Sequence, residues 1–371
     1  MPSTVHPRPA RHAVGRLTGR GLALGRIAAA LALPAGAAAQ PGALDPQCAA
    51  LTSVVDRPLQ DACQKSVDIF ALVASQLGPG IAGGNALLGS GAALGRPGRF
   101  SVGARANVVR ARLPELAGTP VGIAGARAAD FPITRTTVYL PTADAALGVF
   151  AGIDVGPAHV GAVDLLGSLT YVPTYRNPDV RVAARGRRLQ FGYGARVGLL
   201  QETPRLPGLG FTYLRRDVPP TDVRGRVAIA SVAPGGGGAV ADDTVGAAGL
   251  RTTTHAWRLV ASKTVSLVTL SAGGGQDRYD TRARLGAVLN ETLPVVGRVR
   301  IAGEAFDLRQ RLTRTNAFVD LSLTLPVVVL TGEVGRASGG RVARTFNRFE
   351  GRDDRARDAV TYTSVGLRLR F

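Results

Sequence analysis

The chain ends with the stretch Thr361-Tyr-Thr-Ser-Val-Gly-Leu-Arg-Leu-Arg-Phe371, which decides how the rest of the sequence is interpreted. Successive side chains of a β-strand point to opposite faces. The apolar residues from Val365 to Phe371 therefore share one face, and Arg368 and Arg370 share the other. A soluble sheet rarely separates its side chains in this way. A transmembrane barrel strand is apolar toward lipid and polar toward the lumen, so the stretch predicts the last strand of such a barrel.

The same alternation recurs upstream, most clearly in 99–112, 145–155, 160–172 and 188–201. Barrel strands need about ten residues each, and these segments have that length. They predict an all-β, antiparallel transmembrane β-barrel of about twelve strands. The remaining candidates are 207–216, 250–262, 264–274, 281–291, 295–308, 313–324, 326–336 and 359–371.

Connection lengths test this prediction independently. Connections after even-numbered strands are short, as at 262–263 and 325–326, whereas several after odd-numbered strands are long, as at 113–144 and 217–249. Bacterial barrels have short periplasmic turns and longer outer loops, so both ends of the barrel are expected in the periplasm. The segment 223–232 also alternates; we interpret it as a strand extension within an outer loop, and fourteen strands remain an alternative. A soluble β-sandwich or propeller would also give short alternating strands, but it does not explain the connection lengths.

The beginning of the chain has the three parts of an export signal. Residues 1–26 are rich in arginine, residues 27–34 are apolar, and Gly36-Ala-Ala-Ala39 supplies small residues. This order is typical of a secretory signal peptide, and cleavage is expected after Ala39. The apolar run is too short to cross a bilayer.

Residues 40–98 predict a short helical segment in the periplasm, before the barrel. Cys48 and Cys63 are the only cysteines, and in an oxidising compartment such a pair predicts a disulfide. Apolar residues at spacings of three and four predict a helix over 58–77, which Gly78-Pro-Gly80 ends. The same glycines and proline argue against a transmembrane helix here. The segment is expected either at the periplasmic mouth or folded into the lumen as a plug.

The charge balance points to anionic partners. The formal net charge is +19, and 43 of the 45 basic residues are arginine, because Lys65 and Lys263 are the only lysines. No helical recognition module or aromatic RNA-binding motif accompanies this charge, so nucleic acid is not expected. Arginine binds phosphate through two parallel hydrogen bonds. The phosphates of lipopolysaccharide and outer-membrane lipid are the expected partners of exposed arginines.

The signal peptide, the repeated amphipathic strands and the closing Val365-Gly-Leu-Arg-Leu-Arg-Phe371 resemble those of Gram-negative outer-membrane β-barrel proteins. The resemblance covers about residues 99–371 and names an architecture rather than a particular family. It implies an outer-membrane location. It also implies that the barrel-assembly machinery reads the last strand, with Phe371 as the assembly signal.

Enzymatic chemistry is not expected. A phospholipase-type site needs a serine two residues from a strand histidine, but His255 has Thr253 and Trp257 there, and His159 lies in a tight turn. An omptin-like protease needs acids beside a histidine at the outer rim, but the acids nearest in sequence, Asp242 and Asp243, lie in a glycine-rich loop. No cofactor or metal site is expected either.

The charges on the lumen side of the predicted strands carry the functional hypotheses. Burying them in lipid would cost several kcal/mol each, so they must face a polar interior. They set ion selectivity if the lumen is a pore, and they pair across it if it is closed. The first hypothesis is a narrow channel or facilitator for small solutes or ions; the alternative is a structural or surface-interaction barrel that binds lipopolysaccharide or a partner through the arginine-rich loop 336–358. The expected pore-lining residues are Arg105, Asp154, Asp164, Arg196, Arg298, Arg300, Glu304, Asp320, Glu333, Arg368 and Arg370.

Overall fold

A computed structural model describes most of the chain. It divides into two compact units, Met1–Ala38 and Ala39–Phe371, and every described residue belongs to the second unit. The expected signal peptide, residues 1–39, lies outside the described residues. The described ranges are 42–53, 56–116, 119–176, 180–226, 244–293, 297–302 and 306–371.

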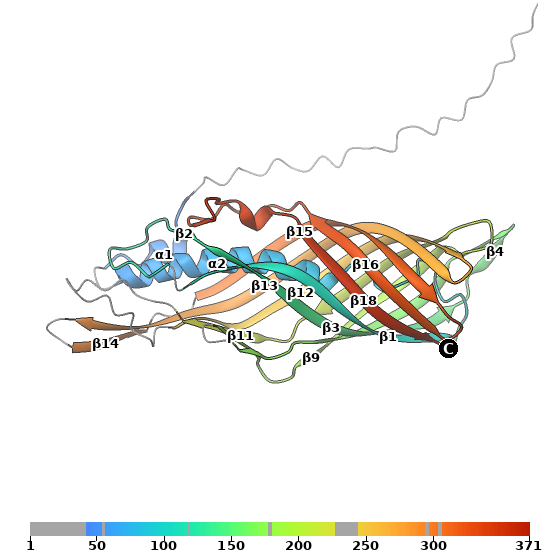
Figure 1. The fold of residues 1–371 in the computed structure, drawn as a ribbon, viewed down its shortest axis with the longest axis horizontal. Helices are drawn as coiled ribbons and strands as arrows, with labels where there is room; N and C mark the ends of the chain where they lie inside the picture. Colours follow the sequence, from blue (N-terminus) through green and yellow to red (C-terminus); the bar gives the residue numbers. More distant parts are fainter. Residues whose placement is uncertain are drawn as a thin grey trace, which may run out of the picture. The chain divides into compact units, whose positions relative to one another are not determined.

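The second unit is built on a closed antiparallel β-barrel (Figure 1). Each strand pairs with the next one along the wall, and the last strand pairs with the first, so the barrel has no free edge. In the described residues ten strands form the closed wall. They are β1 (Phe100–Pro114), β3 (Ile133–Phe150), β6 (Ala162–Tyr171), β9 (Leu189–Leu200), β10 (Gly208–Asp217), β12 (Thr244–Val265), β13 (Val268–Leu293), β15 (Phe306–Thr324), β16 (Val328–Ser338) and β18 (Val360–Arg370).

The shorter elements lie at the two ends of this wall. The hairpin of β4 (Ile153–Val155) and β5 (Ala158–Val160) connects β3 to β6, and β2 (Asp130–Phe131) pairs in parallel with β17 (Arg348–Phe349). Others extend the sheet beyond the closed wall. These are β7 (Tyr175–Arg176), β8 (Val180–Ala184), β11 (Thr221–Arg226) and β14 (Gly297–Ala302), and a 3-10 turn, η1 (Arg355–Arg357), lies in the last long loop.

The barrel is confirmed, but its strand count differs from the expected twelve. Residues 268–274 and 281–291 lie in one continuous strand, β13, because Gly273, Gly274 and Gly275 lie inside the strand rather than at a loop tip. Residues 264 and 265 end β12. A Cβ added at Gly275 would meet the carbonyl oxygen of Trp257, so this glycine marks a close backbone approach. Segment 295–308 contains β14 and the first residues of β15, and segment 313–324 lies within β15. In the described residues β14 pairs with the end of β13 alone, whereas β15 pairs along the wall. Of the segment 223–232, residues 223–226 belong to β11, which pairs with β8 and β12 outside the closed wall, and residues 227–232 lie outside the described residues.

The wall alternates as the sequence predicts, with buried and exposed residues changing places along β18. Four short connections, which include the two-residue turn after Val265, lie at the end that holds Phe371, and we call it the turn end. The opposite, long-loop end holds connections such as 339–359. β12 has 22 residues, which at about 3.3 Å each is about 70 Å, much longer than a membrane crossing requires. The wall therefore continues beyond the membrane at the long-loop end.

The segment before the barrel runs inside it. Helix α2 (Arg57–Ala82) contacts β1, β12 and β13, and its Phe70 packs on Ala283, Leu285 and Leu308 of the inner wall (Figure 1). Its first turn meets loop 115–132 at the long-loop end. Of the two placements that the sequence leaves open, the segment folded into the lumen agrees with these contacts. The first half of α2 also contacts the long loops, as at Asp61 with Gly122 and at Asp68 with Asn347.

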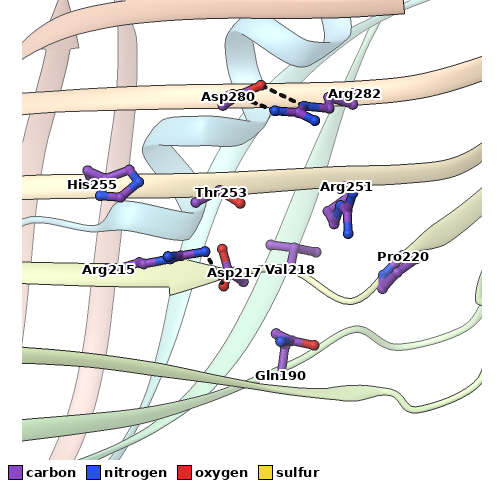
Figure 2. Close-up of a pocket in the computed structure, with 10 residues that line it drawn as sticks. All are labelled: Gln190, Arg215, Asp217, Val218, Pro220, Arg251, Thr253, His255, Asp280 and Arg282. Atoms are coloured by element: carbon purple, nitrogen blue, oxygen red, sulfur yellow. Dashed lines mark hydrogen bonds and ion pairs between the residues drawn. The ribbon is translucent and has the colours of Figure 1, made fainter. Parts of the chain in front are cut away.

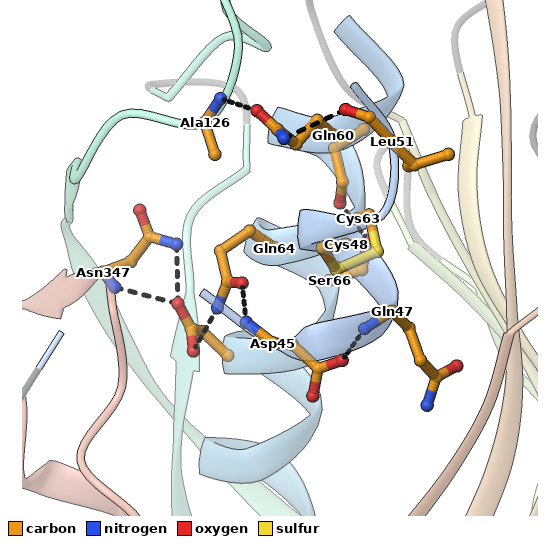
Figure 3. Close-up of a disulfide and its surroundings, with 12 residues drawn as sticks. Asp45, Gln47, Cys48, Leu51, Gln60, Cys63, Gln64, Ser66, Ala126 and Asn347 are labelled. Carbon is orange, nitrogen blue, oxygen red and sulfur yellow. Dashed lines mark hydrogen bonds between the residues drawn. A yellow bond between two sulfur atoms is a disulfide. The ribbon is translucent and has the colours of Figure 1, made fainter. Parts of the chain in front are cut away.

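The disulfide between Cys48 and Cys63 is confirmed and joins α1 (Pro46–Ala49) to α2 (Figure 3). Gln60 donates to the carbonyl of Leu51 and accepts from the amide of Ala126, so the same turn of α2 also holds loop 115–132. Among the described helices, none is both long and apolar enough to cross a membrane. The aliphatic positions of α2 instead face the barrel wall and the loops.

Candidate functional site

The lumen of the barrel is occupied by residues 83–94, which follow α2 and which we call the lumen plug. A Pro-Gly pair near the end of α2 and a left-handed Gly83 (φ 63°) turn the chain out of the helix. The plug is extended and irregular, so its backbone groups need partners other than its own. Charged side chains of the inner wall provide many of them.

Two arginines of the inner wall bind the last residue of α2 and the first residues of the plug. Arg216 donates to the carbonyl of Ala82 over 2.5 Å, and Arg258 donates to the carbonyls of Gly83 and Gly84, both at 2.9 Å. These residues come from neighbouring strands, β10 and β12, whose inward faces alternate with the apolar outer face. Carbonyl oxygens at the C-terminus of a helix carry partial negative charge, which favours arginine there.

Two carboxylates hold the next residues. Glu333 of β16 accepts hydrogen bonds from the amides of Gly84 and Asn85, at 3.1 and 2.6 Å. The Asn85 side chain donates to Asp320 over 2.9 Å, while its carbonyl accepts from Arg105 over 2.7 Å. Asn85 therefore contacts three charged side chains on three strands, and it is the best-anchored residue of the plug.

The last residue of the plug contacts a buried ion pair. Asp164 and Arg196 lie 2.7 Å apart, and the Asp164 carboxylate also accepts from the amide of Leu94 over 3.1 Å. Arg368 donates to the carbonyl of Gly89 over 3.2 Å. At the turn end of the barrel lies a cavity of about 680 Å³, which is lined partly by Arg368 and Arg370.

The inner charges are close to balanced. Six arginines (Arg105, Arg196, Arg216, Arg258, Arg314 and Arg368) and five acids (Asp144, Asp164, Asp277, Asp320 and Glu333) line the inner wall. Arg258 and Asp277 are 2.5 Å apart with almost no exposed surface, and Asp144 pairs with both Arg105 and Arg216 at 2.9 Å. Charges this buried must be paired and hydrogen-bonded, because their desolvation cost is several kcal/mol each.

The structure brings six of the expected pore-lining residues into this network. They come from β1, β6, β9, β15, β16 and β18, which are distributed around the wall. Arg370 faces the cavity at the turn end, half-buried, and does not contact the plug. The six are Arg105, Asp164, Arg196, Asp320, Glu333 and Arg368.

One expected residue, Asp154, does not join the network, and the side chains of three others lie outside the described residues. Asp154 lies on the β4–β5 hairpin, where its side chain is 86% exposed and bonds to His159; β3 ends before it, so the alternation does not continue through it. This hydrogen bond raises the pKa of His159. Arg298 and Arg300 lie on β14, outside the closed wall, and their side chains are outside the described residues, as is the whole of Glu304.

Sequence reasoning missed five residues of the network. One of them, Arg314, alternates along β15 in step with Asp320. Arg216 and Arg258 follow the same alternation as their neighbours and could have been found by extending it. Asp144 was missed because β3 begins at Ile133, within the segment expected to be a loop. Asp277 was missed because the glycines before it suggested a loop tip.

Phe371 closes the barrel at the turn end. Its ring stacks on Phe100 at a centroid distance of 4.7 Å, and the two residues exchange backbone hydrogen bonds of 3.0 and 3.3 Å. Both rings are exposed on the outer face. The first and last residues of the wall are thus held together at one point.

The histidines form no recognisable catalytic site among the described residues. His255 faces outward, and its Nδ1 lies 2.8 Å from the Tyr213 hydroxyl. His255, Asp217 and Asp280 line one cavity on the outer face. The two acids are far from His255 in sequence, so the sequence did not indicate them, and each forms an ion pair with arginine. In the described part of the chain, no three His, Cys, Asp or Glu side chains gather as metal ligands.

No family model and no curated protein matches the sequence. Among solved structures, the translocator domain of the autotransporter NalP from Neisseria meningitidis is 10% identical, with 74% of this chain and 87% of that one covered and a TM-score of 0.35. An outer membrane channel from Pseudomonas putida F1 (10%, 76% and 98% covered, TM-score 0.30) and a FadL homologue from Pseudomonas aeruginosa (10%, 79% and 97%, 0.25) are similar to a comparable degree. Likenesses this distant say nothing about what the barrel carries or binds. Its closed wall, apolar outer face and charged lumen identify the chain as a transmembrane β-barrel protein.

Proposed function

We propose that the barrel is a narrow channel or facilitator for small solutes or ions, and that the lumen plug keeps it closed at rest. The single observation that carries this proposal is the set of wall charges bonded to the plug backbone, from Arg216 at Ala82 to Asp164 at Leu94. A barrel needed only for its outer surface can fill its lumen with apolar side chains. Paired charges around an irregular segment are better suited to a lumen that also admits water.

The nature of the bonds supports a plug that can leave. Most wall contacts go to backbone amides and carbonyls of residues 82–94, which water can replace once the segment moves. The wall ion pairs Arg196–Asp164 and Arg258–Asp277 do not depend on the plug and would remain. Residues such as Arg105 and Glu333 would then line an aqueous path and select ions by charge.

The same geometry assigns a direction to the plug. Short turns are periplasmic in bacterial barrels, so the turn end with Phe371 belongs in the periplasm. Helix α2 then begins at the outer end and leads inward to the plug, and the Cys48–Cys63 disulfide lies outside. Residues 40–98 are therefore proposed as an internal segment rather than a periplasmic one.

A structural or surface-interaction barrel is the second candidate, and the filled lumen favours it. Catalysis is not part of either proposal. Conductance separates the two candidates: refolded full-length protein is compared in planar bilayers with protein that lacks residues 40–98. The channel proposal expects a silent full-length protein and a conducting truncated barrel, with folding of both checked by heat-modifiable migration. A folded truncated barrel without conductance would contradict it.

A further inference from the structure

The outer face of four neighbouring strands, β10, β12, β13 and β15, carries a cluster of arginines at the long-loop end. These residues alternate along their strands with buried residues such as Arg216, Thr254 and Tyr279, so they point away from the lumen. Six arginines and two acids share this face, an excess of four positive charges. They are Arg215, Arg251, Arg278, Arg282, Arg309 and Arg311, with Asp217 and Asp280. We call them the outer arginine cluster.

A cavity of about 450 Å³ lies within the cluster (Figure 2). Arg215 of β10, Arg251 and His255 of β12 and Arg282 of β13 line it, together with residues such as Pro220 and Gln190. Figure 2 shows the cationic side chains arranged around this space rather than stacked on one another. The cavity has the polar lining of a site for a charged group.

The two acids of the cluster are shared among more arginines than they can neutralise. Asp280 pairs with Arg282 and Arg309 and lies 3.8 Å from Arg311. Arg309 donates two hydrogen bonds to the Asp280 carboxylate. Arg251 is exposed and has no acidic partner in the described part of the chain. The cluster thus keeps its positive excess at any physiological pH.

Aromatic residues place the cluster at the boundary between membrane and water. Trp257 and Tyr213 lie on the same outer face, nearer the turn end, with ring centroids 5.6 Å apart. The Arg278 guanidinium stands 5.1 Å above the Trp257 ring. The exposed Phe211 and Leu259 follow further toward the turn end. Aromatic girdles mark the two interfaces of a barrel's apolar band, so the cluster lies where lipid headgroups begin.

We propose that the outer arginine cluster binds the phosphate groups of an outer-leaflet lipid headgroup. Guanidinium groups match phosphate oxygens in a bidentate geometry, and several around one cavity suit a headgroup with more than one phosphate. A lipid is favoured over free phosphate because the cavity adjoins the lipid-facing aromatics. The arginine-rich loop 336–358, expected from sequence to fill this role, is less suitable. Its Arg352 and Arg355 are already paired with Asp354, Asp358 and Glu350.

The chain carries its own reporter for this site, since Trp257 is its only tryptophan. Full-length protein in phosphatidylcholine nanodiscs is titrated with diphosphoryl lipid A, with enzymatically dephosphorylated lipid A and with inorganic phosphate. Trp257 emission is followed, and retained lipid is counted by native mass spectrometry. We expect retention and an emission change with diphosphoryl lipid A alone. Absence of retained lipid A, or equal retention of the dephosphorylated lipid, would overturn the proposal, as would an equal response to inorganic phosphate.

The matched variants remove the same charge at opposite ends of the barrel. Arg251→Gln/Arg282→Gln removes two arginines of the cavity, and we expect it to weaken lipid A binding at least tenfold. Arg96→Gln/Arg205→Gln removes two exposed arginines at the turn end and should leave binding unchanged. Equal weakening in both pairs would show that net charge, not the cluster, attracts the lipid, and would overturn the assignment.

Discussion

Strand β12 carries two arginines in opposite circumstances. Arg258 faces the lumen with 1% of its side chain exposed, pairs with Asp277 and donates to two carbonyls of the plug. Arg251, seven residues earlier, faces outward and is exposed, with no acid beside it in the described residues. The wall therefore uses arginine in two ways. Inside, the charge is balanced and holds a segment of the chain; outside, the excess charge is open to an external anion.

The largest effect on stability is expected when an inner arginine loses its acidic partner. Asp277→Asn leaves Arg258 buried without a counter-charge, and we expect a loss of about 3–5 kcal/mol in the free energy of unfolding. Urea unfolding of the protein in lipid vesicles measures it. Asp307→Asn is the control, because Asp307 and its partner Arg284 are both more than 60% exposed and exposed pairs contribute little. Equal losses in the two variants would contradict the distinction between inner and outer pairs.

The disulfide stabilises the segment at the long-loop end separately from the wall. Cys48 and Cys63 are 15 residues apart, and closing a loop of this size stabilises by about 3 kcal/mol. We expect Cys48→Ser/Cys63→Ser to raise amide hydrogen exchange in residues 44–66 by the corresponding factor. Exchange in the barrel strands should stay as it is. A rise of the same size in β16 and β18, which lie away from the disulfide, would show that the first turns of α2 and the wall are one cooperative unit.

The buried acid Asp68 of α2, which lies among the long loops, makes the stability of the protein depend on pH. Burial raises the pKa of the Asp68 carboxyl from its ordinary value of 3.8 to about 6. Hydrogen bonds from Asn347, Gln64 and Phe346 act in the opposite direction and lower the pKa, but by less. Because the pKa is higher in the folded protein, Asp68 contributes stability below about pH 4 that is lost as pH rises to about 6. Relative to Asp68→Asn, we expect the wild type to lose on the order of 2–3 kcal/mol between pH 4 and pH 7. Parallel stability curves for the two proteins would rule this out.

Deletion of Phe371 removes the aromatic stack on Phe100 and the final pair of backbone hydrogen bonds. The stack itself contributes about 1 kcal/mol. Because the same residue is the expected assembly signal, we expect the level of folded protein in the outer membrane to fall. Phe371→Trp keeps an aromatic ring and should restore that level. A normal level after deletion would exclude Phe371 as the assembly signal.

The wall could be predicted from the sequence because its two faces meet different solvents. Lipid outside and polar lumen inside impose a period of two, and the alternation in 361–371 reports both faces at once. The even number of strands also followed, since it depends only on long and short connections. What failed was the division of 264–324, because glycine marks both loop tips and close backbone contacts, and only the register distinguishes them.

The candidate site was predictable in its residue types but not in its partners. The inward positions of Arg105, Asp164 and Glu333 follow from alternation. That Glu333 binds the amides of Gly84 and Asn85, about 250 residues earlier, depends on threading the segment through the barrel, which leaves no periodic signal. The outer cluster was missed for a related reason. Its arginines come from four strands and become neighbours only through the register of the sheet.

A matched pair of glycine substitutions in the full-length protein tests the closed lumen most directly. A Cβ at Gly84 would lie 2.6 Å from Glu333 and 2.7 Å from the Phe318 ring. Gly84→Val is therefore expected to displace the plug from its contacts with the wall. A Cβ at Gly332, on the neighbouring wall position, meets nothing within 4 Å, so Gly332→Val leaves the plug in place. In planar bilayers we expect conductance from Gly84→Val and silence from Gly332→Val and the wild type. Silence from a folded Gly84→Val protein, or equal conductance from all three, would contradict closure by the plug.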